Sequence, residues 1–141
     1  MPSAPKTLYD PLRRKEVAAT PEERVRQWFI AVLEQSFRVP RHQMMSEVQM
    51  HFGSKPWRAD ILVYDRRQEP LVIVECKREE VEIDAAVLEQ ALRYHAVLHA
   101  PYLFLTNGRS TCLYRRRGDA VTPLDHIPSY EEMVASEAAN A

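Results

Sequence analysis

Two segments of the chain repeat their apolar residues at helical spacing. The first segment, residues 20–37, begins with Thr20 and Pro21, and the apolar residues follow them. A capping hydroxyl followed by proline at the first helical position is typical of a helix N-terminus, so this segment predicts a helix, as does 84–99. The apolar positions are Val25, Trp28, Phe29, Val32 and Leu33 in the first helix, and Val87, Ala91, Tyr94 and Leu98 in the second.

Between and after these helices, the pattern changes to that of strands. Alternating or continuous apolar runs predict strands over 47–52, 58–64, 71–77, 102–106 and 111–115. A strand, a helix and another strand imply a right-handed crossover, which makes the fourth strand parallel to the third. The expected fold is therefore α/β: a mixed sheet, with an antiparallel meander and a parallel crossover strand, flanked by helices.

The length of 141 residues suits one domain. Residues 1–19 contain three prolines and no periodicity, and we expect an arm that lies on the surface or is partly disordered. The domain itself should occupy 20–127, and 128–141 should form a short C-terminal helix and tail.

Charge and hydropathy exclude some classes of protein. Nineteen Lys and Arg against twenty Asp and Glu give a net charge of -1, which excludes a uniformly basic coat for nucleic acid. No apolar run has the length of a membrane span, and the first thirty residues do not resemble a secretion signal. We therefore expect a cytoplasmic protein without a membrane partner.

The candidate chemistry lies in residues 58–77, where the second and third predicted strands form an antiparallel hairpin. If 58–64 and 71–77 pair across a turn at 67–68, the opposed pairs are Asp60 with Glu75, Leu62 with Ile73, and Tyr64 with Leu71. Opposed β-carbons lie roughly 5 Å apart, so two carboxylates should meet. Lys77 follows Glu75 by two residues and should project from the same face.

Two carboxylates this close repel each other unless a positive charge intervenes. A divalent cation would provide that charge, and oxygen ligands suit Mg²⁺ or Mn²⁺. Lys77 could orient an attacking water or stabilise charge on a phosphate. The alternative is structural: Asp60 is a polar residue at a strand start, and Glu75 with Lys77 is an ion pair.

A glutamate in the first helix is a further candidate. Glu22 precedes Val25 by three residues and Phe29 by seven, which puts it on their buried stripe, whereas Glu23 should point elsewhere. His95 and His99 are four residues apart, but without a third ligand they read as ordinary packed or surface histidines.

These residues resemble the PD-(D/E)xK nuclease superfamily and, more narrowly, the N-terminal nuclease domain of type I restriction enzyme R subunits in a short stand-alone form. The likeness covers about residues 8–115. Its motifs are Tyr9-Asp-Pro11, Thr20-Pro-Glu-Glu-Arg-Val-Arg-Gln27, Asp60-Ile-Leu-Val-Tyr-Asp65, Val74-Glu-Cys-Lys77 and Thr106-Asn-Gly108. Ala59 stands where the first nuclease motif has proline.

The resemblance implies a role for each matching residue. Asp60, Glu75 and the main-chain carbonyl of Cys76 would bind the metal, and Lys77 would position water or stabilise the transition state. Glu22 would be the helix glutamate that joins the metal site, with Glu23 as the alternative.

The second helix adds a further match. Gln90 and Tyr94 fit a Gln-x-x-x-Tyr pattern found in part of the superfamily, which makes Gln90 a candidate catalytic residue. In the structural alternative, Gln90 is a polar residue on the helix face and Tyr94 is a core residue.

The expected function is a metal-dependent endonuclease domain that hydrolyses DNA phosphodiester bonds with Mg²⁺, for which Mn²⁺ could substitute. The chain has no Gly-x-x-x-x-Gly-Lys-Ser/Thr loop, so a motor would be separate. Expected partners are DNA and the motor, methyltransferase or specificity subunits of a restriction system; a homodimer is compatible with the sequence. Basic residues in 53–58 and 115–117 could contact DNA phosphates. The alternative is a non-catalytic nucleic-acid-binding or assembly module.

Overall fold

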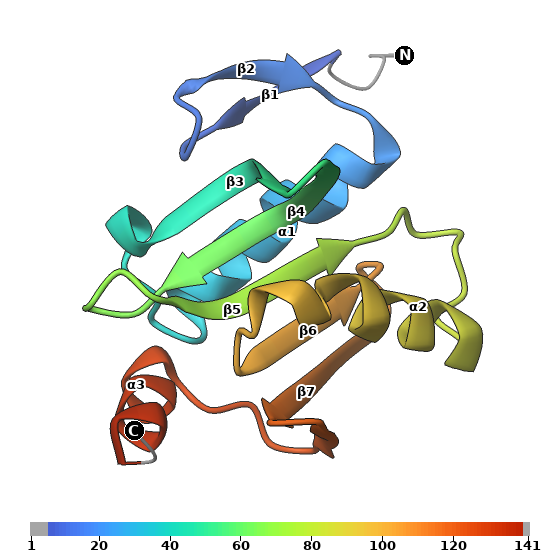
Figure 1. Cartoon of the computed structure of the whole chain (residues 1–141). Helices are drawn as coiled ribbons and strands as arrows, with labels where there is room; N and C mark the ends of the chain where they lie inside the picture. Colours follow the sequence, from blue (N-terminus) through green and yellow to red (C-terminus); the bar gives the residue numbers. More distant parts are fainter. Residues whose placement is uncertain (1–5, 140–141) are drawn as a thin grey trace.

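The computed structural model describes residues 6–139, which form a mixed sheet with helices on both faces (Figure 1). The elements are β1 Thr7–Asp10, β2 Lys15–Ala18, α1 Pro21–Gln35, η1 Arg41–Gln43, β3 Met44–Phe52, β4 Lys55–Tyr64, β5 Pro70–Cys76, α2 Ala85–His95, η2 Ala96–Leu98, β6 Tyr102–Thr106, β7 Thr111–Arg117, β8 Ala120–Leu124 and α3 Tyr130–Ala139. No described helix has the length and apolar character needed to cross a membrane.

Strands β3 to β8 form the main sheet in chain order. The pair β5–β6 is parallel and the other neighbours are antiparallel. This topology confirms the predicted α/β class and its crossover through α2. Strand β8 was not predicted, because it contains Pro123 and mostly exposed residues and so carries little strand pattern.

The register of the β4–β5 hairpin is the one predicted at its centre. Ile61 pairs with Val74, and Leu62 pairs with Ile73. The predicted pairing of Tyr64 with Leu71 is wrong, because a bulge shifts Tyr64 to Pro70. The shift lies on the turn side, so the pairs next to Asp60 and Glu75 keep the predicted register, and the pairing of Asp60 with Glu75 itself stays a prediction.

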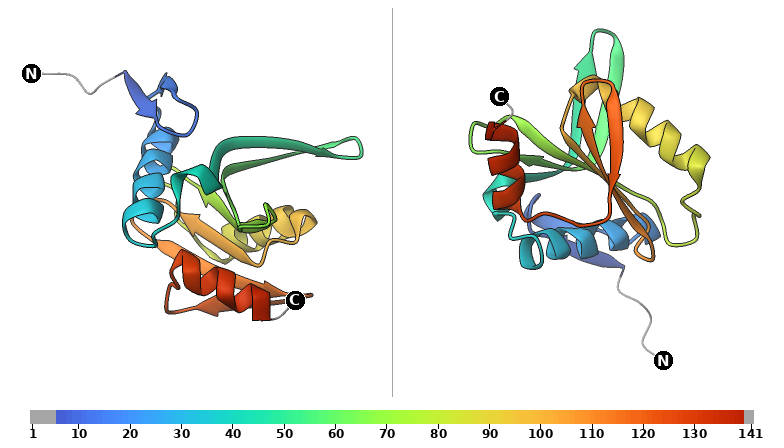
Figure 2. Two further views of the ribbon diagram at one scale, coloured as in Figure 1. Left: turned by 90° about the vertical axis from the view of Figure 1, so that its left-hand side faces the viewer. Right: turned by 90° about the horizontal axis from the view of Figure 1, so that it is seen from below.

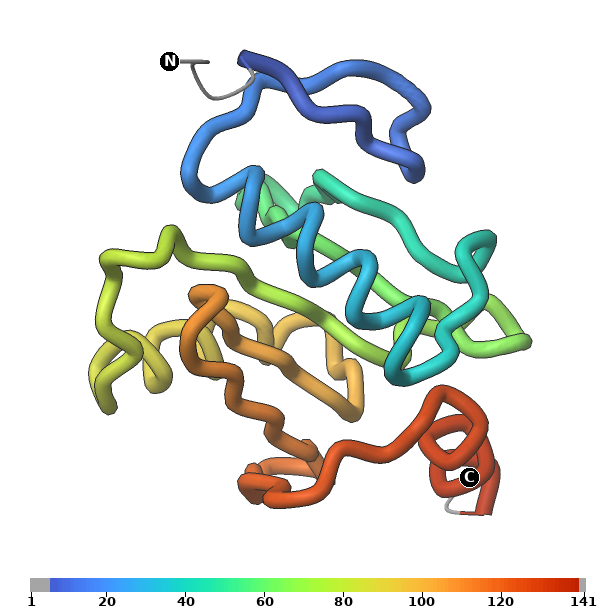
Figure 3. The backbone as a smooth tube through the Cα atoms, turned by 180° about the vertical axis from the view of Figure 1, so that it is seen from behind, coloured from blue at the N-terminus to red at the C-terminus, as the bar shows by residue number. Residues whose placement is uncertain are grey.

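Each face of the sheet carries its own apolar core. Helix α1 covers the back, as Figure 3 shows, and packs Phe29 and Leu33 against β4, β5 and β6. Helix α2 covers the other face and packs Ala91 against Leu62 and Ile73. The sheet is thus buried on both faces where β4, β5 and β6 lie, which explains the continuous apolar pattern of β5.

The start of α1 follows its sequence signal. Thr20 caps the helix by accepting a hydrogen bond from the Glu23 amide at 3.1 Å, and Pro21 is its first residue. The expectation that Trp28 is buried is wrong, because its side chain is 45 % exposed. Trp28 lies at the margin of the apolar stripe, where the helix turns away from the sheet.

Residues 7–18 form a β-hairpin where the sequence showed no periodicity. Asp10 is fully buried and anchors the hairpin to the sheet, because its carboxylate accepts a hydrogen bond from the Ser46 hydroxyl at 2.9 Å. Its other oxygen accepts the Leu12 and Arg13 amides and closes the turn. Whether the domain boundary lies at residue 20 stays a prediction.

Candidate active site

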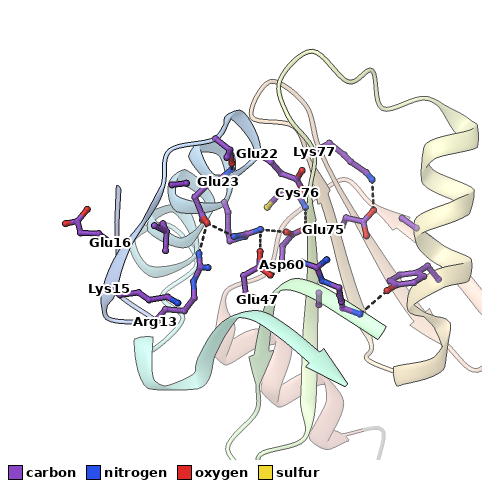
Figure 4. A pocket seen from close by; sticks show the side chains of 18 of the residues that line it. Arg13, Lys15, Glu16, Glu22, Glu23, Glu47, Asp60, Glu75, Cys76 and Lys77 are labelled. Carbon is purple, nitrogen blue, oxygen red and sulfur yellow. Dashed lines mark hydrogen bonds and ion pairs between the residues drawn. The ribbon is translucent and has the colours of Figure 1, made fainter. Parts of the chain in front are cut away.

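A pocket of about 810 Å³ lies between the first turn of α1, the end of β5 and helix α2 (Figure 4). It brings together all the side chains that the sequence singled out for chemistry. They are Glu22, Glu23, Asp60, Glu75, Lys77, Gln90 and Tyr94, with Cys76 beside them. Residues from two strands and two helices therefore meet at one opening.

Asp60 lies where β4 runs alongside the end of β5. One carboxylate oxygen accepts the amide of Cys76 at 2.8 Å, and the other accepts the Arg26 guanidinium at 2.8 Å. The first contact ties Asp60 to the residue that follows Glu75. The second turns its carboxylate toward α1.

Glu75 points instead toward α2. Its Oε1 lies 2.8 Å from His95 Nε2, and its Oε2 lies 3.2 Å from Lys77 Nζ. Burial alone would raise the pKa of the Glu75 carboxyl, but the His95 hydrogen bond and the His95 and Lys77 charges outweigh burial and lower that pKa. Glu75 is therefore a carboxylate at neutral pH.

These contacts offset the repulsion expected between the carboxylates of Asp60 and Glu75. The sequence interpretation called for a divalent cation between Asp60 and Glu75, but Arg26 and Lys77 already supply positive charge to the two carboxylates. The carboxylates line one pocket yet turn toward different helices. Charge neutralisation by itself therefore does not require a metal.

Arg26 is the centre of a buried charge network. Its guanidinium contacts Glu23 at 2.7 Å, Glu47 at 2.6 Å and Asp60 at 2.8 Å, and its side chain is 6 % exposed. Burial lowers the pKa of Arg26, but the carboxylates around it raise that pKa more. The charge of Arg26 is thus permanent, and it fixes Asp60 in place.

The network continues to the N-terminal hairpin. Arg13 contacts Glu23 at 2.6 Å and also pairs with the buried Asp10. A chain of alternating charges therefore connects β1 with Asp60. This hairpin is part of the support of the pocket.

The burial of the two helix glutamates is the reverse of that expected from the sequence. Glu23, expected to point elsewhere, is 6 % exposed, because the hairpin carries Arg13 over it. Glu22 is exposed, since the first turn of α1 extends over the pocket instead of the core. Partial burial and the nearby Asp60 charge raise the pKa of Glu22.

On α2, Gln90 and Tyr94 both line the pocket. The interpretation of Tyr94 as a core residue is wrong, because it is 43 % exposed. Its hydroxyl accepts the Arg58 amide at 2.9 Å and so joins α2 to β4. His95 takes the buried position instead.

The donors of the pocket suit a hard cation in part. Asp60 and Glu75 each use two of roughly four lone-pair sites in the contacts above, so each could also bind a metal. Within residues 6–139, no group of three His, Cys, Asp or Glu side chains is arranged to hold a metal ion. Mg²⁺ commonly binds only one or two protein carboxylates and keeps several waters, so this donor set fits Mg²⁺.

Sequence reasoning missed Arg26, Glu47, His95 and Arg13. Arg26 carried one usable signal, because it follows Glu22 by four residues and so shares its helix face. The other three are brought to the pocket by β3, α2 and the N-terminal hairpin, and no local spacing marks them.

Comparisons with known proteins agree on the type of domain. Residues 21–128 match the family described as Type I restriction enzyme R protein N terminus. None of the curated proteins compared with this chain matches it.

Two solved structures share the fold. One is a fragment of a proposed HsdR subunit of a type I restriction enzyme from Vibrio vulnificus YJ016, with a TM-score of 0.61 and 18 % identity over 84 % of this chain and 25 % of that one. The other is a proposed nuclease of the DUF820 group from Anabaena variabilis ATCC 29413, with a TM-score of 0.50 and 12 % identity over 96 % and 93 % of the two chains. The chain thus spans about a quarter of the HsdR fragment.

Proposed function

This chain belongs to the family of type I restriction enzyme R protein N-terminal domains, and we propose that it is a Mg²⁺-dependent endonuclease domain that hydrolyses DNA phosphodiester bonds. The observation that carries the proposal is the meeting of Asp60, Glu75 and Lys77 in one open pocket. Partners would be DNA and other subunits of a restriction system.

The metal would be held by Asp60, Glu75 and the Cys76 carbonyl, and Glu22, which lines the same pocket, would assist through water. Bound there, Mg²⁺ would supply positive charge to the phosphate oxygens and favour ionisation of a water molecule.

Lys77 has the properties that the reaction needs. Its Nζ lies 3.2 Å from Glu75 and its side chain is 35 % exposed, so it is oriented and still reachable by a phosphate. We assign it the orientation of the attacking water or the stabilisation of negative charge on the phosphate. Gln90, on the opposite wall, would help to orient the same water.

The test compares plasmid nicking by the wild type and by Lys77→Met, with Mg²⁺ or Mn²⁺. We expect the variant to lose about 10²-fold to 10³-fold in rate, the usual effect of removing one charge-stabilising donor. Lys6→Met, which removes an exposed lysine that does not line the pocket, is the matched control and should nick normally.

Calorimetry with Mg²⁺ alone gives the second readout, in which Asp60→Asn should weaken binding. If the wild type and Lys77→Met nick equally, or neither nicks and no metal binds, the proposal fails. DNA binding without cleavage would then favour the non-catalytic module.

A further inference from the structure

The outer part of the β3–β4 hairpin, residues 48–59 and here named the ribbon, extends beyond the sheet. Figure 2 shows it projecting from the body of the molecule. From residue 48 to Gly53 at its tip, the strand spans roughly 17 Å at about 3.3 Å per residue. That length matches the rise of about five base pairs along one strand of duplex DNA.

The charged side chains of the ribbon are all basic. Residues 48–59 contain no Asp or Glu, although the chain has 20 of them. His51, Lys55 and Arg58 are all exposed. An acid-free basic projection on a chain of net charge -1 fits a polyanion better than an ordinary solvated surface.

The inner face of the ribbon is stiffened by α2. Trp57 is 2 % exposed, and its ring lies against His95 with centroids 5.6 Å apart. Phe52 packs on Trp57, and the Tyr94 hydroxyl accepts the Arg58 amide. Because these contacts fix the backbone of the ribbon, the exposed Lys55 and Arg58 are held at set positions along it before any partner binds.

Two other groups of basic residues are engaged within the protein. Arg115 and Arg117 both contact Glu137, and Arg116 donates to the Leu92 carbonyl at 3.0 Å. Arg13 belongs to the charge network below the pocket. Lys55 and Arg58 differ from them in position, because their exposed side chains lie on a projection that leads to the pocket.

We propose that the ribbon binds the phosphate backbone of duplex DNA beside the pocket, through Lys55 and Arg58. The inference rests on the proposed nuclease function and names the surface that would hold its substrate. Arg58 lines the pocket and contacts Glu47 at 3.1 Å, so its guanidinium keeps further donors for a phosphate. Such contacts position DNA without reading its sequence.

The experiment measures binding of a 30-base-pair duplex by fluorescence anisotropy in EDTA, so that no cleavage takes place. Lys55→Ala removes one proposed phosphate contact. We expect it to weaken binding roughly fivefold to tenfold near 0.1 M salt, and to reduce the slope of log K against log salt by about 0.9. Arg67→Ala is the matched control, because it removes one exposed charge from the turn at the other end of β4.

Three results would overturn the inference. They are no binding by the wild type at low salt, an unchanged affinity and salt slope in Lys55→Ala, and equal losses in Lys55→Ala and Arg67→Ala. An unchanged affinity would point to a protein partner for the ribbon. Binding is measured without metal, so the two proposals can be told apart. The DNA-binding role of the ribbon can be refuted while cleavage is observed, and the nuclease function can be refuted while the ribbon still binds DNA.

Discussion

The two sides of the pocket hold their carboxylates by different means. On the α1 side, Asp60 contacts an arginine that is 6 % exposed and shared with Glu23 and Glu47. On the α2 side, Glu75 contacts a single histidine and a lysine that is 35 % exposed. The α1 side therefore has a buried, permanently charged guanidinium, whereas on the α2 side the ammonium group of Lys77 is within reach of solvent. We therefore expect the stability of the fold to depend more on the first side than on the second.

The largest expected effect is that of Arg26→Ala, which leaves three carboxylates without their shared cation. Removing one partner from a buried ion pair destabilises a protein by about 3–5 kcal/mol. Urea denaturation should show a loss in this range. Arg93→Ala, which removes an arginine whose side chain is 76 % exposed on α2, should change stability by about 0.5 kcal/mol or less. Equal losses of stability in Arg26→Ala and Arg93→Ala would contradict a particular contribution of the α1 side to stability.

Asp10→Asn tests the far end of the same charge network through its pH dependence. Burial raises the pKa of Asp10, but hydrogen bonds from Arg13 and Ser46 outweigh it and lower that pKa. The ionised form therefore stabilises the fold above the ordinary pKa of about 3.9, and this stability is lost as pH falls through the folded pKa.

We accordingly expect Asp10→Asn to be less stable than the wild type by roughly 2 kcal/mol at pH 7. The difference should shrink below about pH 4, where the wild type becomes protonated too. Thermal melts between pH 2.5 and 7 measure it, and a difference that stays constant over this range would contradict the assignment.

The smallest expected effect is on the α2 side. His95→Asn removes the contact to Glu75 but leaves Lys77 beside it, so we expect a loss of about 1–2 kcal/mol. His99→Asn is the control, because His99 has a φ of 58° and asparagine tolerates this left-handed conformation well. Chemical denaturation compares the two, and a loss for His95→Asn as large as that for Arg26→Ala would remove the contrast between the two sides.

Much of the fold follows from local sequence patterns. The cap at Thr20 and the strand periods identified the elements, and the predicted hairpin register correctly paired Leu62 with Ile73. The bulge at Tyr64 did not follow, since it depends on the geometry of one turn. Nor did the N-terminal hairpin, whose short strands contain too few apolar positions to show a period.

The sequence by itself determined that Asp60, Glu75 and Lys77 share one pocket, because they lie near the ends of two adjacent strands. Only the tertiary structure decided how the charges are paired. Arg26 and Asp60 are 34 residues apart, and Glu75 and His95 are 20 apart. Contacts of this kind depend on how separate elements pack together, and that packing leaves no periodic trace along the chain.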